Sequence, residues 1–156
     1  MNYQLEFLQA QIGLRNFEGR EGRFNKDGER SFAIFLTEEQ AVELINQGLN
    51  VKPPKFDEEG NQFGRSFLKV KVRFDIMPPE IFFSRGEEDE NGKIIIKLLP
   101  MSELRTLDNA DLEYCDLKVN VREWIKGPNK GKSVYLDSGV FIAKRNPMIE
   151  RYNIQD

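Results

Sequence analysis

Residues 66–76, SFLKVKVRFDI, alternate between apolar and polar side chains, and a period of two is the period of a β-strand. One face of this strand carries Leu68, Val70, Val72, Phe74 and Ile76, and the other carries Phe67, Lys69, Lys71, Arg73 and Asp75. The first face suits a core. The second is basic and holds one aromatic ring, so the segment predicts a half-buried strand in a sheet.

Several other segments also predict strands. CDLKVNVREW (115–124) alternates in the same way, with Leu117, Val119 and Val121 inward and Lys118, Asn120, Arg122 and Trp124 outward. Residues 3–12 alternate with a slip of one residue, as at a β-bulge. RSFAIFL and VYLDSGVFIA have strand composition, and EIFFS with KIIIKLL predicts a hairpin joined by an acidic loop.

Only one helix is clearly indicated. Thr37 and Gln40 have the spacing of a capping box, and Gly48 is placed to end the helix. MSELRTLDNADLE predicts a short helix or turn, and residues 50–65 predict a loop. About seven short strands without a βαβ pattern predict a mainly β fold with one or two helices, as a closed or nearly closed antiparallel barrel or sandwich.

Composition favours binding over catalysis. The 156-residue chain is long enough for one domain with a core, and Cys115, its single cysteine, cannot form an internal disulfide. The absence of histidine removes the commonest general base and metal ligand. The N-terminus resembles neither a signal peptide nor a membrane span, so we expect a cytoplasmic protein without membrane contact.

Charge is segregated along the chain although the net charge is only −3. Residues 117–133 hold five cations against Glu123 alone, whereas residues 87–90 are all acidic. This segregation suits an anion binder with one basic face, although acidic loops are also ordinary solvated surface.

The segment RNFEGREGRFNKDGERSFAIFL (15–36) predicts a hairpin with a long basic tip. Its candidate phosphate ligands are Arg15, Arg20, Arg23, Lys26 and Arg30, and its candidate base-stacking rings are Phe17 and Phe24. Core packing at the base of the hairpin is an equally good interpretation of the two phenylalanines.

Cations and aromatic rings on the outer faces of two strands predict binding to single-stranded nucleic acid. Same-face side chains of a strand lie about 6.6–6.8 Å apart, close to the phosphate spacing of a single strand. The further candidates for phosphate contact are Lys69, Lys71, Arg73, Arg122, Lys126, Lys130 and Lys132, and those for stacking are Phe67, Trp124 and Tyr135. Such contacts are largely independent of sequence.

Other interpretations remain open. Lysine and arginine on a strand often serve only solubility, and Trp124 could close the end of the barrel. GPNKGK lacks the spacing of a phosphate-binding loop, and Asp108, Asp111 and Asp116 match no fixed magnesium ligand set. A protein-interaction accessory factor of a replication or recombination complex and a metal-dependent nuclease are the competing classes, and stacking does not separate DNA from RNA.

The hairpin segment resembles the N-terminal signature of phage-encoded single-stranded-DNA-binding proteins with an OB fold. The positions that carry the likeness are Arg15, Asn16, Phe17, Gly19, Gly22, Phe24, Asn25, Gly28, Arg30 and Phe32. LKVKVRFD (68–75), PPEI (78–81) and NADLEYCDLKVNVREW (109–124) are similar to later strands of that family.

This resemblance implies a five-stranded antiparallel barrel of the OB-fold type, with extra strands, over residues 1–146, followed by a short C-terminal tail over 147–156. It implies a protein that coats single-stranded DNA during phage replication or recombination in the cytoplasm of the bacterial host, without catalysis, cofactor or metal. Phage or host replication and recombination proteins would be further partners, and a homo-oligomer is compatible with the sequence.

Overall fold

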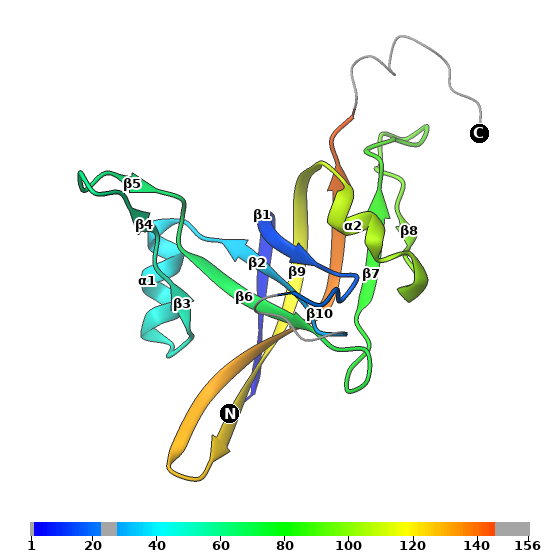
Figure 1. The fold of residues 1–156 in the computed structure, drawn as a ribbon. Helices are drawn as coiled ribbons and strands as arrows, with labels where there is room; N and C mark the ends of the chain where they lie inside the picture. The colour runs from blue at the N-terminus through cyan, green and yellow to red at the C-terminus, as the bar shows by residue number, and fades with distance from the viewer. Residues whose placement is uncertain (1, 23–27, 146–156) are drawn as a thin grey trace.

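The structure is a computed structural model that describes residues 2–22 and 28–145. Five strands are the main elements of its fold. They are β1 (Tyr3–Asn16), β2 (Arg30–Phe35), β6 (Phe67–Val72), β9 (Leu112–Lys126) and β10 (Asn129–Ala143). All five lie where the sequence pattern predicts strands. Figure 1 shows that β9 and β10 form one long hairpin whose tip extends away from the rest of the molecule.

These five strands close into a barrel. β6, β2, β1, β9 and β10 are neighbours in that order, and each of these pairs is antiparallel. Tyr135 of β10 then pairs with Lys71 of β6 in parallel, which joins the two ends of the sheet. The predicted barrel is confirmed, and this parallel closure makes it mixed in direction.

Further strands extend the barrel on both sides. β7 (Glu80–Ser84) pairs in parallel with β10, and β8 (Lys97–Leu98) pairs antiparallel with β7. β3 (Val51–Lys52) pairs with β6, while β4 (Lys55–Phe56) and β5 (Gln62–Phe63) form a separate small hairpin. The predicted hairpin of residues 80–99 is therefore present, with a second strand of only two residues.

The predicted loop over residues 50–65 contains these short strands instead of irregular chain. Asp57 turns the β4–β5 hairpin, because its side chain accepts hydrogen bonds from the backbone N–H groups of Glu59 and Asn61 at 3.0 and 2.8 Å. Gly60, with a φ of 84°, supplies the left-handed residue of this turn. Local polar groups thus form a hairpin without an apolar pattern that sequence analysis could detect.

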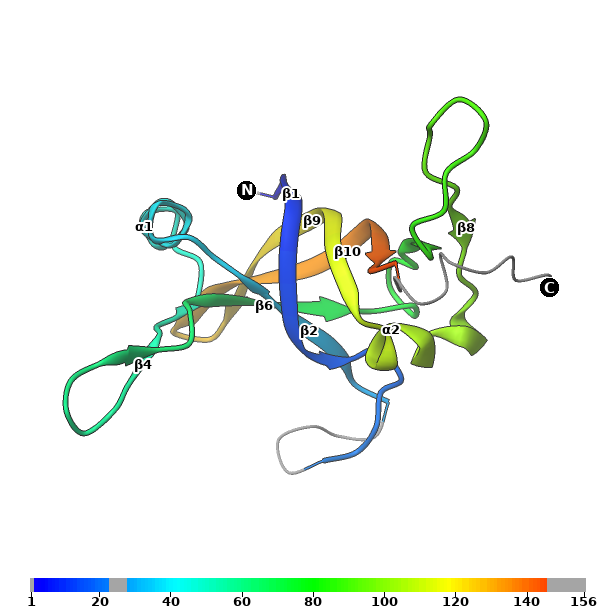
Figure 2. The ribbon, with the colours of Figure 1, turned by 90° about the horizontal axis from the view of Figure 1, so that it is seen from above.

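Helix α1 (Glu38–Asn46) begins with the predicted capping box. The Gln40 N–H donates to Thr37 Oγ1 at 3.2 Å, and the Thr37 N–H donates to Gln40 Oε1 at 2.9 Å. The short helices η1 (Met101–Glu103) and α2 (Arg105–Asn109) lie where a helix or turn is predicted. Figure 2 shows α1 and α2 on opposite sides of the barrel. No helix within the described residues is long and apolar enough to cross a membrane.

The barrel is filled by the inward residues of its strands together with a cluster of three phenylalanines. Phe17 stacks on Phe32 with ring centres 5.0 Å apart and meets Phe141 edge to face at 5.5 Å. Phe17 is completely buried. The prediction of Phe17 as a base-stacking residue is therefore wrong, because its ring belongs to the core.

Strand β1 changes register at the predicted phase slip. The pairing with β9 shifts between Phe7 and Ala10, and Gln9 has a φ of 51°. The N–H of Gln9 donates to an Asp116 carboxylate oxygen at 2.8 Å, so the bulge does not leave it without a partner. Leu8 consequently faces solvent and is 72% exposed, whereas Phe7 and Ala10 are buried.

Candidate nucleic-acid interface

Three predicted residues meet at the seam where the barrel closes. Tyr135 lies opposite Lys71 across the β6–β10 pair and opposite Asn120 across the β9–β10 pair. Lys71 Nζ and the guanidinium carbon of Arg122 are each 5.9 Å from the centre of the Tyr135 ring. Two cations from two different strands thus lie over this half-buried aromatic ring, and Arg122 Nη2 also donates to Met77 Sδ at 2.7 Å.

Two rows of predicted residues extend from this seam along the outer wall. Lys71 and Lys69 are exposed and Phe67 is half-buried, and the strand period places all three on one face of β6. Arg122 and Trp124 share the outer face of β9, since Leu117, Val119 and Val121 point into the core. We call Phe67, Lys69, Lys71, Arg122, Trp124 and Tyr135 together the cationic face.

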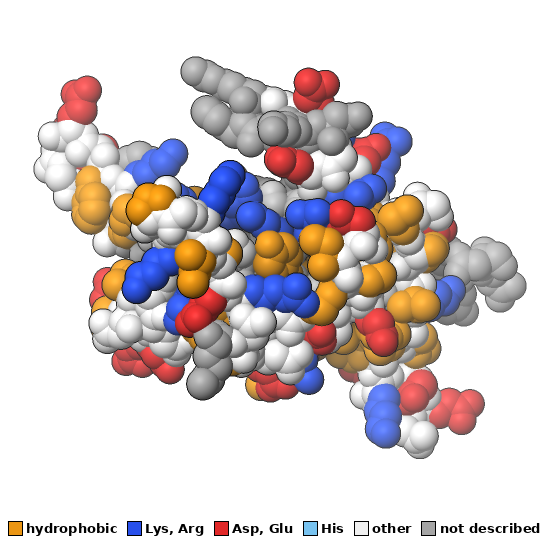
Figure 3. All heavy atoms as spheres, turned by 90° about the horizontal axis from the view of Figure 1, so that it is seen from below, with side chains coloured by type: hydrophobic (Ala, Val, Ile, Leu, Met, Phe, Trp, Pro, Cys, Tyr) orange, Lys and Arg blue, Asp and Glu red, His pale blue; other side chains and the backbone are white. Residues whose placement is uncertain are grey.

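Figure 3 looks onto the end of the molecule from which the β9–β10 hairpin extends. Lysine, arginine and hydrophobic side chains lie interspersed across the middle of this view, while most acidic side chains lie nearer its edges. This distribution matches the segregation of charge along the sequence. It provides the mixture of cations and apolar groups that an unpaired, negatively charged polymer requires.

Arg73, the predicted cation at the end of β6, is less available for phosphate contact than the sequence suggested. Arg73 Nε and Nη2 donate to the two carboxylate oxygens of Asp75 at 2.9 and 2.7 Å. This bidentate pair lowers the pKa of Asp75 from 3.8 to about 2 and raises the pKa of Arg73. The strand ends at Val72, and Ile76 is 54% exposed instead of facing the core, because the chain turns at the Arg73–Asp75 pair.

Trp124 lies near the tip of the β9–β10 hairpin, against the backbone of the opposite strand. It pairs with Gly131, and a Cβ at that glycine would lie 2.5 Å from Cζ2 of the indole. The ring is 43% exposed. Lys126 and Lys130 are exposed beside it, so the tip carries one aromatic surface and two available cations.

Lys132 is occupied within the protein. Its Nζ donates to the backbone carbonyl of Gln47 at 2.6 Å, lies 3.9 Å from Glu123 and lies 5.3 Å from the centre of the Tyr3 ring. These contacts attach the hairpin to the C-terminal end of α1. Lys132 is therefore a tether of the hairpin in this structure and not an available phosphate ligand.

Most described residues of the hairpin segment build its base. Arg15 Nη1 donates to the carbonyl oxygens of Leu107 and Ala110 at 2.8 and 2.6 Å. Asp108 accepts the N–H groups of Phe17 and Glu18 at 2.7 and 3.0 Å. Arg15 would have to break two hydrogen bonds to reach a phosphate, so the structure assigns it to the frame of this loop.

Asn16 orders the next turn of the same loop. Its Oδ1 accepts the N–H groups of Gly19 and Arg20 at 3.0 and 2.9 Å, and its Nδ2 donates to the carbonyl of Arg20 at 2.9 Å. The exposed side chain of Arg20 lies 3.7 Å from Glu18. Asn16 and Gly19, two residues of the motif that carries the family resemblance, thus stabilise the conformation of this loop.

Of the remaining predicted residues of this segment, one is described by the structure and three are not. The Arg30 guanidinium carbon is 5.5 Å from the centre of the Phe74 ring, and its buried Nε has no hydrogen-bond partner in the described structure. Arg23, Phe24 and Lys26 lie outside the described residues, and their assignment remains a prediction.

Sequence analysis did not identify Phe35 and Arg65 as part of this surface. Phe35 pairs with Phe67 across β2 and β6, and the Arg65 guanidinium carbon lies 5.9 Å from the centre of the Phe35 ring. The Phe35 ring also covers Gly13 of β1, where a Cβ would lie 2.5 Å from Cζ. The alternation in β2 suggests an outward Phe35, but only the strand register reveals its neighbours.

The three aspartates that could have suggested a nuclease serve separate structural roles. Asp108 and Asp116 accept backbone N–H groups, and Asp111 lies 3.7 Å from Lys144 Nζ. Within residues 2–22 and 28–145, no group of three or more acidic or cysteine side chains could hold a metal ion.

A mixed five-strand barrel with cations and aromatic rings on its outer wall defines the class of oligonucleotide-binding barrels. The sequence matches the family model described as "Putative phage ssDNA-binding domain" over residues 2–155. The chain belongs to this family. The predicted family resemblance is thus confirmed.

Solved structures of the single-stranded DNA-binding protein from bacteriophage Enc34 share the fold. A C-terminal truncation and a complex with ssDNA each match with a TM-score of 0.51 and 10% identity, covering 92% of this chain and 88% of that chain. A further structure of the same protein matches with the same score and identity over 96% and 87%. No curated protein matches this chain by sequence.

Proposed function

We propose that this protein binds single-stranded DNA across the cationic face, largely without sequence preference and without catalysis. The observation that carries the proposal is the contact of Tyr135 with both Lys71 and Arg122, at the seam of the barrel. A base could stack on the ring when the cation over that face turns to a neighbouring phosphate, so that base stacking replaces the cation–ring contact. Family membership and the ssDNA complex of the Enc34 protein support this assignment.

The two rows on the outer wall suggest the path of the strand. One row follows β6 through Lys71, Lys69 and Phe67, and the other follows the β9–β10 hairpin through Arg122 and Trp124. Asp137 lies on β10 just beyond Tyr135 and accepts a hydrogen bond from Asn120 Nδ2 at 3.2 Å. The negative charge of Asp137 disfavours a path of the DNA strand past the end of the seam where this residue lies.

Single strands suit this face better than duplexes. Bases in a duplex are stacked on one another and cannot lie on Tyr135 or Trp124 without unpairing, whereas bases of a single strand can. Phage replication and recombination expose such strands, so coating them in the cytoplasm of the bacterial host is the biological role we propose. Coating requires no bond to be made or broken.

The proposal is tested by the salt dependence of oligo(dT) binding. Replacing Lys71 and Arg122 by alanine should lower the affinity and reduce the slope of log K against log salt by roughly 0.7 for each lost phosphate contact. Tyr135→Leu should weaken binding by roughly 1–3 kcal/mol with little change in slope, because it removes stacking and no charge.

Lys93→Ala is the matched control for the two cation variants, because Lys93 is exposed in the loop between β7 and β8. It should leave both affinity and slope unchanged. If the Lys71 and Arg122 variants bind with the slope of the unaltered protein, the cationic face is not the binding site. Parallel titrations with duplex DNA and with RNA of the same sequence test the preference for single-stranded DNA, and loss of the oligonucleotide on adding magnesium would instead indicate a nuclease.

A further inference from the structure

Strand β8 forms an open edge of the sheet. The order of strands ends at β8, and no described strand pairs with its outer side. The N–H groups of Ile95 and Leu99 donate inward, to the carbonyls of Glu87 at 2.8 Å and Ile81 at 2.7 Å. Because N–H groups alternate in direction along an extended strand, those of Ile94, Ile96 and Leu98 point outward from this edge.

The same three residues form an exposed apolar stripe. Their side chains are 38%, 43% and 63% exposed for Ile94, Ile96 and Leu98, and the strand period places them on one face. Exposed edges are normally protected by charged residues or proline. Residues 94–99 contain a single charged side chain, Lys97.

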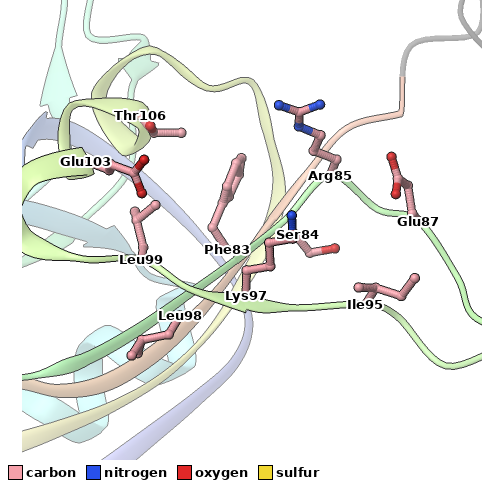
Figure 4. Close-up of a pocket in the computed structure, with 10 residues that line it drawn as sticks. All are labelled: Phe83, Ser84, Arg85, Glu87, Ile95, Lys97, Leu98, Leu99, Glu103 and Thr106. Atoms are coloured by element: carbon pink, nitrogen blue, oxygen red, sulfur yellow. The ribbon is translucent and has the colours of Figure 1, made fainter. Parts of the chain in front are cut away.

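The charge of Lys97 is turned away from this stripe. Together with Phe83 and Leu99, Lys97 lines a pocket of about 280 Å³, which Leu98 also borders. Figure 4 shows the side chains of Lys97 and Leu98 on opposite sides of the strand. As far as the described residues extend, the outer edge of β8 therefore combines backbone N–H groups that have no partner with an apolar surface that carries no charge.

We propose that this edge pairs with the β8 edge of a second copy of the protein, antiparallel and about a two-fold axis at Ile96. In this register Ile96 lies opposite its own copy, and Ile94 lies opposite Leu98 of the other copy. All three are residues whose N–H groups point outward, so they meet as hydrogen-bonded pairs. A register centred on Lys97 is disfavoured because it would place two lysines opposite each other.

The charges that flank the strand are compatible with the same arrangement. Residues 87–93 hold four acidic side chains and Lys93, whereas the strand is followed by Glu103 and Arg105. Glu87, Glu88, Glu90 and Arg105 take part in no ion pair found within the described residues. In an antiparallel pair, the acidic loop of one copy lies towards the end of the other that carries Arg105, where this cation is available to the acidic side chains.

The pairing would leave both cationic faces accessible. β8 is the edge strand of the sheet, and β7 separates it from β10 and the β6–β10 seam. Figure 1 shows β8 and the tip of the β9–β10 hairpin at opposite ends of the molecule. The inference does not depend on the proposed function, and its test needs no DNA.

The test combines cross-linking and sedimentation of the full chain. Two hydrogen-bonded partners have Cα atoms about 5.5 Å apart, within the roughly 4.4–6.8 Å that a disulfide spans, so Ile96→Cys should form a covalent dimer under mild oxidation. Sedimentation from micromolar to near-millimolar protein should show a reversible dimer, and Ile96→Lys should weaken it by roughly tenfold by setting two positive charges opposite each other.

Variants at Val42 serve as controls, because this side chain is 58% exposed on α1, away from β8. Val42→Cys should not cross-link, and Val42→Lys should not change the dimer. Should Ile96→Lys misfold by circular dichroism, Leu98→Lys tests the same edge at a more exposed position. Three results would overturn the inference: a monomer at every concentration, a dimer that the β8 variants leave unchanged, or equal cross-linking at Val42. A monomer would mean that the β8 edge is available to pair with a segment of another protein.

Discussion

The indole ring of Trp124 lies against Gly131 on the opposite strand of the hairpin, where a Cβ would approach Cζ2 to 2.5 Å. Glycine at position 131 therefore holds the only tryptophan of the chain in place near the tip of the β9–β10 hairpin. The two residues together make a flat aromatic surface on an extended part of the protein.

Replacing Gly131 by alanine should displace this ring. Because the contact is with the end of a side chain, the indole can move aside, and we expect the free energy of unfolding to fall by less than about 1 kcal/mol. The emission maximum of Trp124 should shift, and its quenching by oligo(dT) should decrease. Gly22→Ala is the control, since a Cβ there meets no atom within 4 Å; equal quenching in both variants would separate Trp124 from the binding site.

Asp75 restrains the cation at the end of β6, so Asp75→Asn should release Arg73. We expect tighter oligo(dT) binding and a salt slope steeper by up to roughly 0.7, the value for one additional phosphate contact. Binding that is weaker, or unchanged in slope, would show that Arg73 lies off the path of the strand. Glu58→Gln, which removes one exposed negative charge from the β4–β5 turn, reports any effect of charge that does not depend on position.

The same pair makes a prediction about pH. The Arg73 guanidinium lowers the pKa of Asp75 to about 2, below its value in an unfolded chain. The ion pair therefore stabilises the fold above the usual carboxyl pKa, and this stabilisation is lost as the pH falls towards 2. An NMR titration should place the Asp75 midpoint near 2, and Arg73→Ala should return it to the ordinary range; an unchanged midpoint in that variant would assign the shift to another group.

Asp108 should matter for stability more than a surface carboxylate does. Asp108→Ala leaves the N–H groups of Phe17 and Glu18 without their acceptor, and we expect a loss of roughly 1–3 kcal/mol in the free energy of unfolding by urea. Asp111→Ala removes only an exposed ion pair with Lys144 and should cost less than about 1 kcal/mol. Equal losses would mean that Asp108 does not position the loop.

Cys115 should be chemically inert in the folded protein. Burial raises the pKa of its thiol to about 12, so hardly any thiolate exists near neutral pH. A thiol-specific chromogenic reagent at about pH 8 should leave the native protein unmodified and react with one thiol after unfolding. Rapid modification without denaturant would show that β9 opens locally around this residue.

Elements governed by local chemistry were predictable from the sequence. The capping box of Thr37 and Gln40, the alternation in β6 and the bulge after Phe7 all depend on residues within a few positions of one another. Each appears in the structure at the predicted place. The short β4–β5 hairpin was missed because it is held by the side chain of Asp57 and buries no apolar stripe.

The candidate site was only partly predictable because it is assembled across strands. Lys71, Arg122 and Tyr135 are separated by 51 and 13 positions in the sequence, yet they meet because β10 pairs with both β6 and β9. Phe17 and Arg15 show the reverse. Their types suit DNA contact, but their partners Phe141 and Leu107 lie far along the chain and assign them to the core and the loop frame.

The seam between β6 and β10 also has a consequence for synthesis of the protein. Lys71 has emerged from the ribosome long before Tyr135, and β10 must follow before the wall can close. A nascent chain that ends before β10 lacks the final partner of both β6 and β9 and cannot yet display the assembled surface. The protein should thus acquire its affinity for a polyanion late in translation, after most of the chain has been synthesised and has emerged from the ribosome.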